Sequence, residues 1–172
     1  MIKKEILNFL NENKEFIFKY HKNYSPFFPG CCVDITSMLH HFILQYYGVD
    51  LNWSKATKKF YPNNKLFHLW LELDNTVIDF SLFQFYIGKN KFKKVSDDIA
   101  YAYCINEVQR GDIAFDKKYY LNIFEDIVNA DRELYYGYFL GDMRAITINK
   151  DLSPRESLIE FYEKCIPLIK NN

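Results

Sequence analysis

A short turn between two apolar segments constrains the fold more than any other feature of this sequence. Asp74-Asn75 separates residues 66–73 from residues 76–80, and both segments are rich in leucine, aromatic and β-branched side chains. Asp and Asn readily adopt the backbone conformations of tight turns, so the pattern predicts a β-hairpin with a two-residue loop. An antiparallel pair of strands is therefore expected near the middle of the chain.

The length of the turn determines which side chains share a face of the hairpin. If Leu73 pairs with Thr76, then His68 and Asp79 are diagonal neighbours on one face, about 7–8 Å apart, and their side chains can meet. A three-residue loop would place them on opposite faces, because a slip of one residue reverses the direction of every side chain. The hairpin thus predicts a His68–Asp79 pair.

A helix with a cysteine in its first turn is the second well-defined element. Apolar residues recur every three or four positions after Cys32, and Gly48 follows as a C-terminal cap. These apolar positions are Ile35, Met38, Leu39, Phe42, Ile43 and Tyr46. Backbone N–H groups and the helix dipole favour an anion at a helix start, so we expect the thiolate of Cys32 to be stabilised. A thiol, an imidazole and a carboxylate in this order fit a nucleophile, its base and the group that orients the base.

The rest of the chain indicates a mixed α+β fold. The spacing of apolar residues predicts helices over residues 2–19, 119–128 and 153–170, the last with a capping box formed by Ser153 and Glu156. Strands are expected near residues 57–61, 98–108 and 143–148, and loops over residues 20–29 and 62–64. The lysine-rich segment 89–94 is interpreted as a solvated loop or a contact for a partner.

Length and composition limit the classes of function. The 172 residues, 49% of them hydrophobic, can fill one core, so residues 1–172 are expected to form a single domain. Lys plus Arg and Asp plus Glu both number 22, which provides no net field to recruit nucleic acid or a membrane surface. No segment approaches the ~18 consecutive apolar residues of a membrane span, and residues 1–10 lack the composition of a signal peptide. The oligomeric state is not indicated.

Cysteine usage gives the expected compartment. The four cysteines form neither a CxxC pair nor the dense pattern of a secreted disulfide scaffold. We therefore expect a reducing, cytoplasmic location, with export by a signal-less route left open.

The chain resembles the transglutaminase-like branch of the papain-like superfamily. The resemblance rests on Gly30–Thr36, on His68–Glu72, and on Ile78–Ser81 followed by Gln84-Phe85. It implies a nucleophile helix packed on a small antiparallel sheet, and a triad without metal or cofactor. In that triad Cys32 attacks a carbonyl carbon, His68 pairs with the thiol and protonates the leaving group, and Asp79 fixes the imidazole tautomer.

The doubled cysteine departs from the family pattern and leaves one assignment open. Cys31 is the alternative nucleophile, but Cys32 matches the family position better because Asp34 and Thr36 follow it. The backbone N–H of Cys32 is expected to stabilise the oxyanion. A second donor could come from residues 23–25 or from Gln84.

Plainer interpretations accompany each of these residues. Cys32 could be a buried core residue, His68 a satisfied sheet histidine, and Asp79 the end of a strand. Zinc binding by Cys31, Cys32, His68 and Asp79 is disfavoured, because adjacent cysteines seldom chelate one ion and no zinc-finger spacing is present. His40 and His41 point in different directions on a helix and make poor joint ligands.

The predicted function is hydrolysis of an amide or peptide bond in a protein or peptide substrate, through a thioester. Such an enzyme would be a cysteine peptidase or a protein-glutamine deamidase. Transglutaminase or other acyltransferase activity on the same triad is the first alternative. A non-catalytic protein-binding domain is the second. The sequence specifies neither the substrate nor the pathway.

Overall fold

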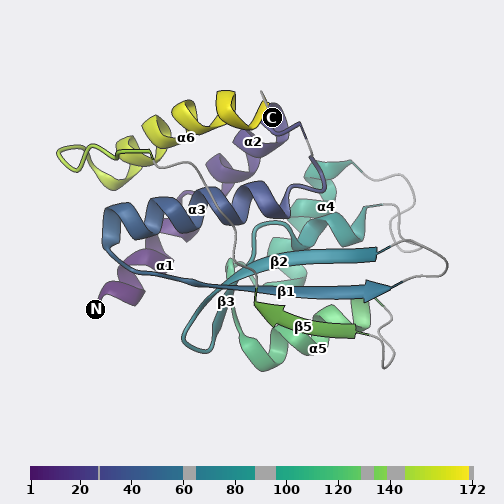
Figure 1. Ribbon diagram of the computed structural model, residues 1–172. Coiled ribbons are helices and arrows are strands. Elements are labelled where there is room, and N and C mark those ends of the chain that lie inside the picture. Colours follow the sequence, from purple (N-terminus) through teal and green to yellow (C-terminus); the bar gives the residue numbers. More distant parts are fainter. Residues whose placement is uncertain (27, 60–64, 88–95, 129–133, 139–145, 171–172) are drawn as a thin grey trace.

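An antiparallel sheet packed against helices forms the framework of the computed structural model (Figure 1). The structure describes residues 1–26, 28–59, 65–87, 96–128, 134–138 and 146–170. The helices are α1 (Ile2–Glu12), α2 (Lys14–Tyr24), α3 (Cys32–Tyr47), α4 (Asp97–Tyr103), α5 (Lys117–Val128) and α6 (Pro154–Lys170). The strands are β1 (Asn52–Lys59), β2 (Lys65–Leu73), β3 (Thr76–Ile78), β4 (Ala114–Asp116) and β5 (Leu134–Tyr138). A 3-10 turn, η1 (Leu82–Tyr86), and a π-helical turn, η2 (Cys104–Val108), complete the regular structure of the described residues. The mixed α+β class is confirmed.

The sheet contains the predicted hairpin in the predicted register. Its strand order among the described residues is β4-β3-β2-β1-β5, and every neighbouring pair is antiparallel. Leu73 pairs with Thr76, and Asp74 takes a left-handed backbone conformation with φ of 56°. This register places His68 and Asp79 on the same side of the hairpin.

The return strand is shorter than the sequence predicts. It ends at Ile78 instead of Phe80, because the Asp79 carboxylate accepts hydrogen bonds from the backbone N–H and the hydroxyl of Ser81. Such a local side-chain bond turns the chain out of the strand direction. The Asp79 N–H still donates to the carbonyl of Ile113, at 3.4 Å.

The prediction of one N-terminal helix over residues 2–19 is wrong. Asn13 interrupts it with φ of −107° and ψ of 8°, and its side-chain amide donates to the carbonyl of Phe9. The Phe9 carbonyl thus accepts from both the backbone N–H and the side-chain amide of Asn13, and the non-helical backbone of Asn13 separates α1 from α2. Helix α2 then continues to Tyr24, so the loop predicted from residue 20 begins at Ser25.

The predicted cysteine helix is confirmed as α3, which runs to Tyr47 and is capped by Gly48 with φ of 70°. The N–H of Gly48 donates to the carbonyl of Leu44, as expected for a left-handed C-cap. Helix α3 packs against β2, and α6 packs against α3 (Figure 1). This packing holds the first turn of α3, and Cys32 with it, beside the sheet.

Of the other strand predictions, the one over residues 98–108 is wrong, and the one near residues 57–61 is confirmed with an earlier start. Residues 98–108 form α4 and η2, because Ser96 caps the helix with its hydroxyl and Asp97 and Asp98 fall in the first turn. Residues 146–149 have no regular structure, and the strand near residue 57 begins earlier, at Asn52. The capping box of Ser153 and Glu156 is confirmed. The lysine-rich segment 89–94, the turn 62–64 and residues 143–145 lie outside the described residues.

A buried histidine joins two helices of the core. His21 on α2 is fully buried, and its Nε2 lies 3.1 Å from the hydroxyl of Tyr162 on α6. Burial lowers the pKa of His21 to about 3, so the imidazole is neutral in the folded protein. Within the described ranges, no helix is both long enough and apolar enough to cross a membrane.

Replacing Gly48 tests the helix terminus. An added Cβ would meet no atom within 4 Å, so Gly48→Ala loses stability only through the strained backbone. We expect the free energy of unfolding to fall by about 1 kcal/mol, measured by urea denaturation. Gly48→Asn is the matched control and should cost less, because Asn tolerates the left-handed region. Equal stability of the alanine and glycine proteins would contradict this geometry.

His21 should make the protein sensitive to acid. The unfolded chain binds a proton at His21 below pH ~6.5, whereas the folded chain resists it until about pH 3. The stability that neutral His21 contributes is therefore present above pH ~6.5 and is lost as the pH falls. Between pH 7.5 and pH 5, we expect wild type to lose about 2 kcal/mol more unfolding free energy than His21→Gln. An unchanged difference between the two proteins at both pH values would contradict the buried neutral imidazole.

Candidate active site

His68 and Asp79 form a buried pair at the centre of the molecule. His68 projects from β2, Asp79 follows β3, and the Nε2 of His68 lies 2.7 Å from Oδ2 of Asp79. The two residues are 0% and 2% exposed. The contact predicted from the hairpin register is therefore confirmed.

The Asp79 carboxylate has two hydrogen-bond donors on each oxygen. Oδ1 accepts from the backbone N–H and the hydroxyl of Ser81, at 2.8 and 3.0 Å. Oδ2 accepts from His68 and from the hydroxyl of Tyr120, at 2.7 and 2.8 Å. Burial alone would raise the pKa of Asp79, but the charge of His68 and these hydrogen bonds outweigh burial and lower it. Asp79 is thus ionised although it is buried.

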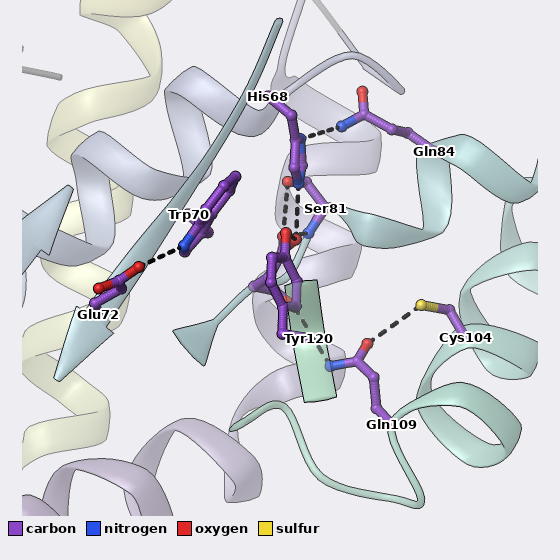
Figure 2. A network of polar contacts seen from close by, with 9 residues as sticks. His68, Trp70, Glu72, Ser81, Gln84, Cys104, Gln109 and Tyr120 are labelled. Atoms are coloured by element: carbon purple, nitrogen blue, oxygen red, sulfur yellow. Dashed lines mark hydrogen bonds and ion pairs between the residues drawn. The ribbon is translucent and has the colours of Figure 1, made fainter. Parts of the chain in front are cut away.

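The second ring nitrogen of His68 is directed toward η1. Its Nδ1 lies 3.0 Å from the side-chain nitrogen of Gln84, and Figure 2 shows Gln84 on the opposite side of the ring from Ser81 and Tyr120. Since Nε2 keeps its proton for the carboxylate, Nδ1 is the nitrogen that can gain or lose one. The Gln84 side chain can form a hydrogen bond with Nδ1 whether Nδ1 is protonated or not, because its amide carries both a donor and an acceptor.

Cys32 is the cysteine that contacts the imidazole. Burial tends to lower the pKa of His68, but the charge and hydrogen bond of Asp79 and a hydrogen bond with Cys32 raise it to about 9. Cys31 is fully buried, and burial together with the nearby Asp34 carboxylate raises the pKa of its thiol. The structure thus separates the two adjacent cysteines, with Cys32 at the histidine and Cys31 in the core.

Aromatic rings exclude water from the pair. The ring centroids of Phe85, Phe124 and Trp70 lie 4.9, 5.5 and 6.0 Å from that of His68. Cys32 is 4% exposed, whereas the adjacent Val33 is 40% exposed. The first turn of α3 therefore reaches the surface and brings the thiol close to it. Charges interact more strongly in such a poorly solvated site than in water.

A second polar chain holds the backbone at Asp79. Gln109 donates from Nε2 to the carbonyls of Asp79 and Asp112, at 3.5 and 3.1 Å, and accepts from the thiol of Cys104 (Figure 2). On the other side of the site, Trp70 donates to Glu72. These contacts fix the ends of β2 and β3 around the pair.

The sequence did not reveal two partners of the site. Tyr120 falls on the apolar face of a predicted helix and looks like an ordinary core residue, and Gln109 directly follows the strand predicted over residues 98–108. A buried tyrosine hydroxyl needs a partner, but the sequence does not say which one. Gln84 was named from the sequence as a possible second donor to the oxyanion.

Other histidines take part in local contacts. His40 pairs with Asp50 at 2.8 Å, and His41 lies 3.3 Å from the backbone of Ile146. Among the described residues, no group of three or more His, Cys, Asp or Glu side chains is arranged to hold a metal ion.

Comparisons with known proteins found no match to this chain among protein-family models, curated proteins or solved structures.

Alkylation rates should distinguish the four cysteines. At pH 7 we expect iodoacetamide to modify Cys32 first, because it lies beside the imidazole at a helix start near the surface. Burial raises the pKa values of Cys31, Cys104 and Cys165 and should protect them. His68→Gln should slow the reaction of Cys32 at least about tenfold by removing the proton acceptor. The measurement is peptide mass spectrometry over time.

The unfolded protein provides the control for this experiment. In concentrated urea all four cysteines should react at similar rates in both proteins. The thiol–imidazole pair would be contradicted if Cys32 in the native protein reacted no faster than Cys165. It would also be contradicted if the alkylation rate of Cys32 were the same in wild type and in His68→Gln.

Proposed function

We propose that this protein is a cysteine-dependent acyl-transfer enzyme that hydrolyses an amide or peptide bond in a protein or peptide. The observation that carries the proposal is the contact between the Cys32 thiol and the buried His68–Asp79 pair. Amides are poor electrophiles, so their cleavage needs a strong nucleophile and a proton donor for the departing nitrogen. Cys32 and His68 together would supply both.

The roles follow from which atoms face one another. The Cys32 thiolate bonds to the carbonyl carbon, and the π electrons move to the carbonyl oxygen. When the oxyanion collapses, the C–N bond breaks and the nitrogen leaves with the proton of His68 Nδ1. Water then attacks the thioester and returns a proton to Nδ1, and the second collapse releases the thiolate. Asp79 keeps the proton of Nε2 in place throughout.

The oxyanion would be stabilised at the first turn of α3. Cys31, the N-cap residue, makes no side-chain capping hydrogen bond, so backbone N–H groups such as that of Cys32 can donate to an anion. Of the two sources considered for a second donor, the Gln84 amide lies beside His68, whereas the Ser25 hydroxyl donates to Asp34. Gln84 is therefore the better candidate.

We assign the fold to the transglutaminase-like branch of the papain-like superfamily as part of the same proposal. Its support is the order of Cys32, His68 and Asp79 on a helix, a strand and the end of the next strand. Helix α3 packs against β2 of a small antiparallel sheet, as the family pattern requires. Water is preferred over an amine as acceptor, because no second, amine-binding site was recognised in the sequence.

Free cysteines bear on the proposed compartment. Cys31, Cys32, Cys104 and Cys165 are all free thiols in the structure. We propose that the enzyme works in a reducing environment such as the cytoplasm.

The burial of the site favours one rival function. Cys32, His68 and Asp79 are all at most 4% exposed, so a substrate reaches the thiol only if the covering residues move. A non-catalytic binding domain on the same scaffold would need no such movement. The two functions can be distinguished by activity. The enzyme cleaves a bond and needs Cys32 to do so, whereas the binding domain cleaves none.

Bond cleavage in a peptide library tests the proposal. Wild type should generate new peptide amino termini or convert glutamine to glutamate, both read by mass spectrometry. Cys32→Ala and His68→Gln should each reduce the rate by about 10³-fold or more, and Asp79→Asn by a comparable factor. Cys165→Ser, which alters a buried cysteine on α6, is the matched control and should retain activity. Conversion that persists unchanged in Cys32→Ala would refute a cysteine enzyme.

A further inference from the structure

Tyr120 on α5 brings a hydroxyl group into a cluster of aromatic rings from α5, β2 and β4. Its ring lies 5.1, 5.4 and 6.0 Å from the ring centroids of Trp70, Phe115 and Phe124. A phenylalanine would satisfy this packing equally well, so packing does not account for the hydroxyl. That hydroxyl donates to Oδ2 of Asp79, the same oxygen that accepts from His68.

We propose that Tyr120 is a positioning residue of the active site, which acts on His68 through Asp79 and sets the basicity of the imidazole. A role of Tyr120 in catalysis depends on the proposed function. The hydrogen bond itself is independent of that function.

The start of α5 is fixed, which aims the phenol at the carboxylate. The ammonium group of Lys117 pairs with Glu72 of β2 at 2.8 Å, and its backbone N–H donates to the carbonyl of Asn75. Asp116 caps the first turn through the N–H of Tyr119. Two contacts therefore hold the start of α5 against the hairpin and a third caps the helix, one turn from Tyr120.

Tyr120 and His68 share the negative charge of one carboxylate oxygen. Each donor withdraws part of the electron density of Oδ2. The hydrogen bond from the phenol therefore weakens the electrostatic attraction between Asp79 and the imidazolium of His68. Tyr120 is fully buried, and burial and the charge of Asp79 raise its pKa far above the usual range, so the phenol remains a donor. Without the hydroxyl, Asp79 would be more basic and would keep His68 protonated to higher pH.

The titratable groups facing this network come from several elements. They are Cys31 and Cys32 at the start of α3, His68 on β2, Cys104 on η2 and Tyr120 on α5. Burial raises the pKa values of Cys31 and Cys104, so neither thiol titrates near neutral pH. Changes of His68 titration can thus be traced to Cys32, Asp79 and Tyr120.

The test is the titration of His68, followed by NMR of its ring nitrogens in the intact protein. Tyr120→Phe should move the midpoint upward by about one pH unit, since a hydrogen bond to a charged group is worth enough to shift it by this amount. The alkaline limb of the pH profile of Cys32 alkylation should move by the same amount. Replacing Tyr120 by 3-fluorotyrosine, a stronger donor, should move the midpoint in the opposite direction.

Tyr162→Phe is the matched control. Tyr162 is also fully buried, and its hydroxyl contacts His21 instead of Asp79. This variant should leave the His68 midpoint unchanged even if it loses stability. A Tyr120→Phe protein with an unchanged midpoint would overturn the proposal and leave Tyr120 as a core residue.

The failure of this inference and the failure of the proposed function are distinguishable. The His68 titration requires no turnover, and it can also be followed in Cys32→Ala, where Tyr120→Phe should still produce an upward shift. A protein with that shift but no cleavage of any peptide would retain the Tyr120 assignment and lose the enzyme. Cleavage without the shift would retain the enzyme and lose the role of Tyr120.

Discussion

The buried negative charge of Asp79 is the constraint on which the rest of the site depends. A carboxylate away from water is tolerated only when its oxygens are fully hydrogen-bonded and a positive charge lies close by. The chain meets this demand with His68 from β2, Ser81 after β3 and Tyr120 from α5. The hairpin, the turn into η1 and the start of α5 must therefore all be in place together.

The same demand explains why the site is dry and enclosed. Aromatic rings cover the imidazole, and the described neighbours of Asp79 leave no oxygen without a donor. A rigid, poorly solvated pair is suited to hold one histidine tautomer, but it also restricts access to the thiol. The position of helix α3 reduces the conflict between burial and access. Cys32 in its first turn is buried, but the adjacent Val33 is exposed, so the thiol lies close to the surface.

Local patterns were sufficient for the parts of the protein that short-range rules control. The two-residue turn fixed the register of Leu73 and Thr76, and thereby the meeting of His68 and Asp79. The stripe of α3 with Gly48, and the capping box of α6, also follow from neighbours in sequence. Local patterns misled where one side chain redirects the backbone, as Asn13 does between α1 and α2 and Ser96 does before α4.

The sequence by itself determined the mixed α+β class, the hairpin register and the set of a thiol, an imidazole and a carboxylate. Only the tertiary structure decided that Cys32 and not Cys31 contacts His68, and that Tyr120 completes the shell of Asp79. The physical reason is the distance along the chain. Register and caps depend on residues a few positions apart, whereas Tyr120 lies 41 positions after Asp79 and meets it only when α5 packs on the sheet.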